Sequence, residues 1–110
     1  NDWDDICRYR ASDPSVMAAA YGVHPWWAHN WIESVDSWAA ELEQKLQEDD
    51  HGIVGEIGLD KLWVAPDTNM HHWDAQVALF ERQMELATKL DRPVSLHCVK
   101  CEGWMMDYFR

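Results

Sequence analysis

The 110-residue sequence is poor in basic residues and in long apolar runs, and both shortages exclude classes of protein. Nine Lys and Arg oppose 20 Asp and Glu, so a formal net charge of -11 argues against a surface that neutralises many phosphates unaided. Bound divalent cations would supply positive charge, so nucleic acid is not excluded as a substrate. No run approaches the roughly 18 to 20 apolar residues that a membrane span needs, and we expect no membrane partner.

Cysteine is also scarce. Cys7, Cys98 and Cys101 are too few, and odd in number, for the disulfide framework of a small secreted protein. We therefore expect an intracellular location, cytoplasmic or nuclear. The last two have the CxxC spacing of zinc and redox sites, but no second pair completes a structural zinc site. We interpret Cys98 as a small buried residue and Cys101 as a loop residue.

Aromatic and apolar residues are abundant by contrast, with eight Trp and a hydrophobic content of 47%. That composition is typical of a folded chain, and the length suits a single domain over residues 1–110. The chain starts without Met and ends inside an amphipathic segment. We expect a partial domain, because three predicted strands would leave both edges of their sheet bare.

Three short apolar runs predict buried strands, at residues 16–23, 53–59 and 94–99. They lack clean alternation, as is typical of strands covered on both faces, and a proline or glycine precedes each run. Segments with helical periodicity lie between the runs, at 35–46 and 73–90. This alternation predicts an α/β fold with a parallel sheet and right-handed crossovers.

The sequence also predicts where the two longer helices begin or end and which side of the second helix is apolar. Ser34 is a suitable N-cap for the first helix. The second helix must end near Leu90, before Pro93. Its predicted apolar stripe is Trp73, Val77, Phe80, Met84 and Ala87. Shorter helices are expected near residues 3–7 and 104–109.

Polar residues follow or end all three predicted strands. His24 comes after the first strand, Glu56 and Asp60 belong to the second, and His97 to the third. The carboxyl ends of parallel strands meet at one edge of the sheet, where sites of such folds form. Imidazole and carboxylate groups suit divalent Zn, Mn, Ni or Fe. We therefore predict Glu56 and His97 as metal ligands.

Other interpretations of these residues stay open. Glu56 could form a buried salt bridge with an arginine, and His97 could be a hydrogen-bonded core histidine. For His24 a structural or substrate-facing role is favoured over direct ligation. The remaining histidines are interpreted as surface residues, namely His29, His51, His71 and His72.

Three tryptophans follow His24 closely, at Trp26, Trp27 and Trp31. Aromatic side chains at the rim of a nucleic-acid site can stack on unpaired bases. They can equally pack as a hydrophobic lid. The sequence does not choose between the two roles.

Four motifs together resemble the TatD family of metal-dependent hydrolases. They are Gly22-Val-His-Pro25, Val54-Gly-Glu-Ile-Gly-Leu-Asp60, Gln76-x3-Phe80-x2-Gln83-x2-Leu86-Ala87 and Arg92-Pro-Val-Ser-Leu-His97. Their order and spacing all agree with the family. The Trp pair after Pro25 and the Ser-Leu-His-Cys-Val sequence around His97 are most similar to its fungal Cut9-interacting-protein branch.

The resemblance implies a partial TIM-type (β/α)8 barrel with a metal centre at its carboxyl mouth. Family members are described as Mg-dependent deoxyribonucleases, often 3'-to-5' exonucleases, so it implies DNA as substrate and two divalent ions, Mg or else Zn, Mn or Ni. It places Glu56 as the carboxylate that bridges both ions and His97 as a ligand to one. Both are thereby predicted as catalytic residues, with His24 and Asp60 as substrate-binding residues.

The resemblance also predicts what the chain lacks. The family's opening His-x-His pair has no counterpart here, and its later histidine and aspartate would follow Arg110. With at most two of six ligands, the chain alone is expected to be inactive. The alternative hypothesis is a catalytically degenerate barrel that acts as a protein-interaction partner.

Overall fold

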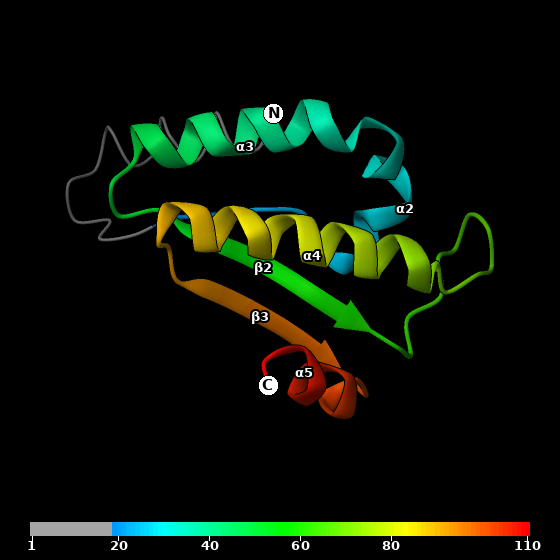
Figure 1. The fold of residues 1–110 in the computed structure, drawn as a ribbon. Helices are drawn as coiled ribbons and strands as arrows, with labels where there is room; N and C mark the ends of the chain where they lie inside the picture. Colours follow the sequence, from blue (N-terminus) through cyan, green and yellow to red (C-terminus); the bar gives the residue numbers. More distant parts are fainter. Residues whose placement is uncertain (1–18) are drawn as a thin grey trace.

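Residues 19–110 are described by a computed structural model, in which three parallel strands form one sheet in the order β1-β2-β3 (Figure 1). The strands are β1 (Ala20–Tyr21), β2 (Ile53–Asp60) and β3 (Val94–Val99). The predicted α/β fold with a parallel sheet is confirmed. That the chain forms the central portion of a complete barrel stays a prediction.

The first predicted strand is shorter than expected. Of residues 16–23, the structure describes those from 19 onward, and only Ala20 and Tyr21 pair with β2. The backbone N–H and carbonyl of Val23 bond to the side chain of Gln83 instead of to a strand. A side chain therefore replaces the sheet partner at this point, which the apolar pattern could not reveal.

The helices follow the chain in the order η1 (Pro25–Trp27), α2 (Ala28–Trp31), η2 (Ile32–Ser34), α3 (Val35–Glu48), α4 (Trp73–Leu90) and α5 (Glu102–Tyr108). The three helices predicted within the described residues are present as α3, α4 and α5. The three short turns between His24 and Val35 were not predicted. The helix expected near residues 3–7 lies outside the described residues.

Two local predictions about the helices are wrong in part. Ser34 is the N-cap residue of α3, but its hydroxyl makes no capping bond and donates to the carbonyl of Trp31 at 3.3 Å. The buried face of α4 is also rotated from the predicted stripe. Its buried residues are Gln76, Leu79, Phe80, Gln83, Leu86 and Ala87. Two amides replace apolar residues on that face because they bond to backbone groups of the strand ends.

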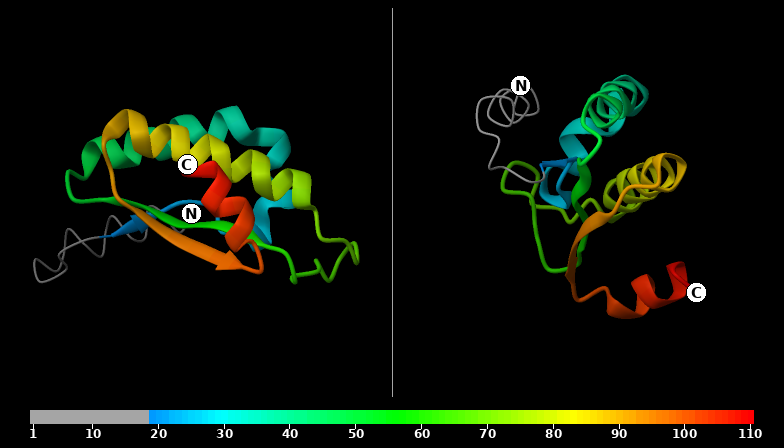
Figure 2. Two further views of the ribbon diagram at one scale, coloured as in Figure 1. Left: turned by 60° about the horizontal axis from the view of Figure 1, so that its bottom comes forward. Right: turned by 90° about the vertical axis from the view of Figure 1, so that its left-hand side faces the viewer.

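The helices α3 and α4 lie on one face of the sheet, and α5 follows the end of β3 (Figure 2). The core fills the space between these helices and the strands, with Tyr21, Leu42, Leu46, Ile57, Leu79 and Phe80 among its most buried side chains. Within residues 19–110, no helix combines the length and apolar character that crossing a membrane requires.

Strand β2 leaves no room for a side chain against β3 at Gly58. Its φ is 151°, and a Cβ there would lie 1.8 Å from the carbonyl oxygen of His97. The pairing of the two strands also shifts register between Val54 and Ile57. This irregular stretch contains Glu56, so the side chain of that residue need not follow the regular alternation of a strand.

Candidate metal centre

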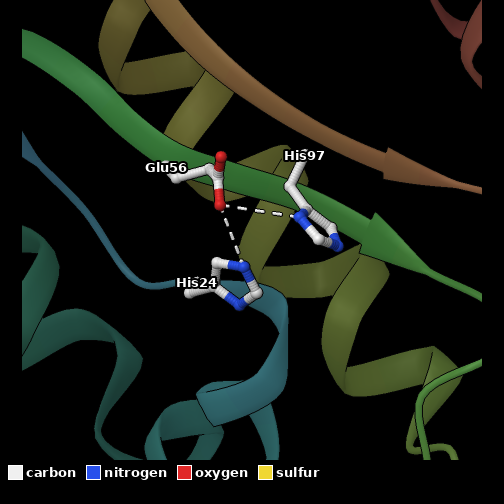
Figure 3. A group of neighbouring side chains, drawn as sticks. All are labelled: His24, Glu56 and His97. Atoms are coloured by element: carbon white, nitrogen blue, oxygen red, sulfur yellow. Dashed lines mark ion pairs between the residues drawn. The ribbon is translucent and has the colours of Figure 1, made fainter.

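Three side chains from different parts of the sheet point toward one another: His24 after β1, Glu56 in β2 and His97 in β3 (Figure 3). One potential ligand atom from each lies within 4.8 Å of the others. Parallel strands place their carboxyl ends at one edge, and the loop after β1 adds its histidine there. The structure therefore brings together three of the four predicted site residues in one group.

The carboxylate of Glu56 is the centre of this group. Its Oε1 lies 3.0 Å from Nε2 of His24 and 3.5 Å from Nδ1 of His97. The side chain of Glu56 is 48% exposed, whereas those of the two histidines are 22% and 18% exposed. The partners of Glu56 in these contacts are imidazoles, so the open interpretation of a buried pair with arginine finds no support in the described residues.

Asp60, the fourth predicted residue, lies behind His97. Its Oδ2 accepts a hydrogen bond from Nε1 of Trp26 at 2.9 Å and faces Nε2 of His97 at 3.1 Å. Its Oδ1 accepts the backbone N–H groups of Leu62 and Trp63. Burial alone would raise the pKa of this carboxyl, but the hydrogen bonds from Trp26, His97 and the two backbone groups outweigh it and lower the pKa. Asp60 is thus a carboxylate acceptor.

This carboxylate fixes the tautomer of His97. A carboxylate can only accept, so Nε2 of His97 carries the proton and donates to Asp60. In the neutral ring Nδ1 is then unprotonated, and it lies 3.5 Å from Oε1 of Glu56. Carboxylate–histidine pairs of this kind orient the ligand histidines of metal sites.

His24 has the same tautomer, but its protonated nitrogen faces Glu56. Its Nδ1 accepts the backbone N–H of Trp26 at 3.1 Å, as the N-cap of η1. Nε2 must therefore carry the proton of the neutral ring, and it donates to Glu56. Burial, and the nearby His97, lower the pKa of His24 against the opposing effect of Glu56. His24 is a hydrogen-bond donor in this arrangement, and its predicted substrate-facing role stays a prediction.

The donor set fits a divalent cation. It offers a half-exposed carboxylate and one unprotonated imidazole nitrogen, which suit Mg, Mn or Zn.

The two cysteines of the CxxC motif are not part of this donor set. Cys101 is buried, and its burial, followed by the effect of Cys98, raises the pKa of this thiol to about 12, so the thiol stays protonated. Cys98 is only partly buried, against the prediction, whereas Cys101 lies between β3 and α5 as predicted for a loop residue.

The aromatic residues beside the site form a stacked pair. The ring of Trp26 stacks on that of Trp63, with centroids 6.0 Å apart and planes 9° apart. Trp26, Trp27 and Trp31 remain exposed in the described part of the chain. Base stacking and lid packing both stay predictions for them.

One histidine expected at the surface is largely buried. His29 stacks on His72 with ring centroids 4.4 Å apart, and its Nε2 lies 3.1 Å from Asp67. Local sequence patterns do not relate His29 to Asp67 or His72, because these residues are distant along the chain. These histidines do not belong to the group around Glu56.

Sequence reasoning assigned no role to Gln76 and Gln83, although both belong to the motif quoted from α4. They bond to the backbone of Asp60 and Val23, next to the site. The available signal was their spacing of seven residues within an amphipathic helix, which places two amides on one face.

The whole chain is similar to one protein family. The model of the family described as TatD related DNase matches residues 1–110. A 3'-5' ssDNA/RNA exonuclease TatD from Edwardsiella piscicida is 40% identical over 85 residues, which cover 77% of this chain and 30% of that protein. An uncharacterized deoxyribonuclease of Saccharomyces cerevisiae is 24% identical over 151 residues, covering 96% of this chain and 48% of that protein.

A human 3'-5' RNA nuclease is 29% identical over 110 residues, covering 98% of this chain and 13% of that protein. The chain thus spans about half or less of the length of these relatives. No solved structure matches it.

Proposed function

The chain belongs to the TatD related DNase family, and from this premise we propose that its site is part of the metal centre of a deoxyribonuclease. The reaction is hydrolysis of phosphodiester bonds, with nucleotides released from the 3' end, as the names of several relatives suggest. One observation supports it most directly. Glu56 meets His24 and His97 at the edge of a parallel sheet where such sites form.

Glu56 and His97 are the ligands in this proposal. Glu56 would contribute its carboxylate to two divalent ions, and His97 would contribute Nδ1 to one of them, the nitrogen that its bond to Asp60 leaves unprotonated in the neutral ring. The ions are Mg, with Zn, Mn or Ni as alternatives. The chemistry that bound cations would supply is activation of water at neutral pH and stabilisation of the negative charge of the phosphate. They would also offset the acidic character of the chain.

His24 is proposed to face the substrate. Its Nε2–H points to Glu56 and is the right type of group to donate to a phosphate oxygen. The substrate-binding role predicted for Asp60 is less well supported, because its side chain is buried and both oxygens have protein partners. We propose instead that Asp60 orients His97.

Removal of metal tests the proposed reaction. In the protein at its natural length, incubation with EDTA is expected to stop the shortening of a 5'-labelled single-stranded oligonucleotide, and added Mg or Mn should restore it. The measurement is the ladder of products on a denaturing gel, with a 3'-blocked oligonucleotide as the control for polarity. The reason is that Glu56 and His97 can hold a cation but provide no strong nucleophile of their own.

An unchanged rate in EDTA would contradict the metal-dependent reaction. No cleavage under any metal condition, together with specific capture of a protein partner, would support the alternative of a degenerate barrel that serves in protein interaction. Cytoplasmic or nuclear location also remains a proposal, which rests on the low cysteine content.

The role of Asp60 leads to a separate prediction. Asp60→Asn puts one oxygen and one NH2 group where the carboxylate accepts through both oxygens. The amide cannot accept from Trp26 and His97 and from the backbone N–H groups together, so the tautomer of His97 is no longer fixed. We expect the affinity for Mn to fall about 10- to 100-fold, as for other partners of metal-binding histidines. Isothermal titration with Mn measures the change. Asp107→Asn, an exposed carboxylate in α5, should leave the affinity unaltered.

A further inference from the structure

Two buried glutamines on α4 bond to the backbone on which the site residues stand. Gln83 is 1% exposed, and its Oε1 accepts the N–H of Val23 at 2.7 Å. Its Nε2 donates to the carbonyls of Val23 at 3.3 Å and Leu79 at 3.1 Å. Val23 directly precedes His24, so the side chain of Gln83 holds the peptide next to that imidazole.

Gln76 makes the same contact with the end of β2. It is also 1% exposed, and its Oε1 accepts the N–H of Asp60 at 2.7 Å. Its Nε2 donates to the carbonyls of Asp60 at 3.2 Å and His71 at 2.9 Å. Asp60 in turn accepts from His97, so this glutamine holds the carboxylate that orients the predicted ligand.

The two contacts share one geometry. Each amide pairs with both backbone groups of a single residue, as a neighbouring strand would. Gly22 makes room for one of them, because a Cβ there would lie 3.0 Å from Oε1 of Gln83. A side chain of fixed length on a rigid helix thus sets how far each backbone segment lies from α4.

We propose that Gln83 and Gln76 are positioning residues with separate tasks, Gln83 for His24 and Gln76 for the Asp60–His97 pair. The inference rests on the proposed function, in which His24 faces the substrate and His97 holds a cation. Gln83 therefore governs the use of substrate, and Gln76 governs the affinity for metal. A helix that covers the sheet thereby sets the two halves of the site independently.

Separate substitutions test this division in the protein at its natural length. Gln83→Met keeps the length of the side chain and removes all three hydrogen bonds. We expect kcat/KM for a single-stranded oligonucleotide to fall about 10- to 100-fold, since small misplacements at a site have effects of that size. The dissociation constant for Mn, measured by calorimetry without substrate, should change less than twofold.

Gln76→Met should give the converse result for metal. We expect the dissociation constant for Mn to rise about 10-fold or more, because Asp60 no longer holds His97 in place. Cleavage should recover in part at high Mn concentration. It should not recover for Gln83→Met, whose metal site is intact.

Two further variants control for loss of structure. Gln44→Met removes an exposed amide of α3 whose Nε2 donates to Glu48, far from the site, and should change neither quantity. Gly22→Ala pushes against Oε1 of Gln83 without removing the amide, and should lower kcat/KM in the same direction as Gln83→Met. Melting temperatures of all variants are recorded so that activities are compared well below unfolding.

Substitute variants are used if a methionine variant does not fold. Gly22→Ala then tests the role of Gln83, and Gln76→Glu, which retains the acceptor for the N–H of Asp60, tests the role of Gln76.

The inference is overturned if both methionine variants lower metal affinity and kcat/KM in parallel with their melting temperatures. The same result from Gly22→Ala and Gln76→Glu, used where a methionine variant does not fold, would also overturn it. Unchanged values in the variants would overturn it as well. Failure of the proposed function has a different signature, because the unaltered protein would then bind no Mn and cleave no oligonucleotide.

Discussion

Glu56→Gln is expected to reduce metal-dependent cleavage by at least about 100-fold, an effect at the upper end of that known for groups that support metal sites. Glutamine preserves the shape of the side chain but replaces a charged carboxylate by a neutral amide with one oxygen. The proposed bridge between two ions is thereby lost, and with it both cation positions. The rate of oligonucleotide shortening at saturating Mg, together with Mn binding by calorimetry, measures the effect.

The melting temperature separates this loss from unfolding. Glu56 is half exposed and pairs only with histidines in the contacts described above, so its replacement should shift the melting temperature little. Glu33→Gln, at an exposed position of η2, is the matched control and should retain full activity. Undiminished cleavage by the Glu56 variant would eliminate the bridging role.

Gly58→Ala is expected to be the most destabilising small substitution in the sheet. The backbone at Gly58 has a φ of 151°, which side chains rarely adopt, and the new methyl group would lie 1.8 Å from the carbonyl oxygen of His97. Strands β2 and β3 would have to separate at the residue that carries a predicted ligand. We expect a loss of about 3 kcal/mol or more in the free energy of unfolding. Urea denaturation followed by circular dichroism measures it.

Gly103→Ala provides the comparison for the same chemical change. A Cβ at Gly103 meets no atom within 4 Å, and the residue lies in α5. Alanine favours a helix over glycine by about 0.5–1 kcal/mol, so this variant should be as stable as the unaltered protein or slightly more so. Equal urea midpoints for the two alanine variants would show that β2 and β3 tolerate separation at Gly58.

Most of the secondary structure could be predicted because it depends on local patterns. The strands β2 and β3 and the helix α4 have nearly the predicted bounds, and Pro93 sets the end of that helix as expected. The segment after His24 could not be predicted in the same way. Its turns η1, α2 and η2 are each three or four residues long, too short to show a period.

The candidate site was predictable in part for a different reason. Glu56 and His97 stand out as polar residues in apolar strands, and the parallel order of those strands places them at one edge. The role of Asp60 depends on Trp26, which is distant in sequence and reaches it only through the fold. Periodicity also could not show that Gln76 and Gln83 belong to the buried face. A buried amide needs a hydrogen-bond partner, and their partners are backbone groups of other segments.

By itself the sequence determined the order of strands and helices, the parallel sheet and the identity of an acid and an imidazole suited to a cation, since these follow from periodicity and residue chemistry. Only the tertiary structure decided which nitrogen of each histidine carries the proton. That choice depends on hydrogen bonds from Trp26 to His24 and from His97 to Asp60, and contacts between separate elements exist only once the chain has packed.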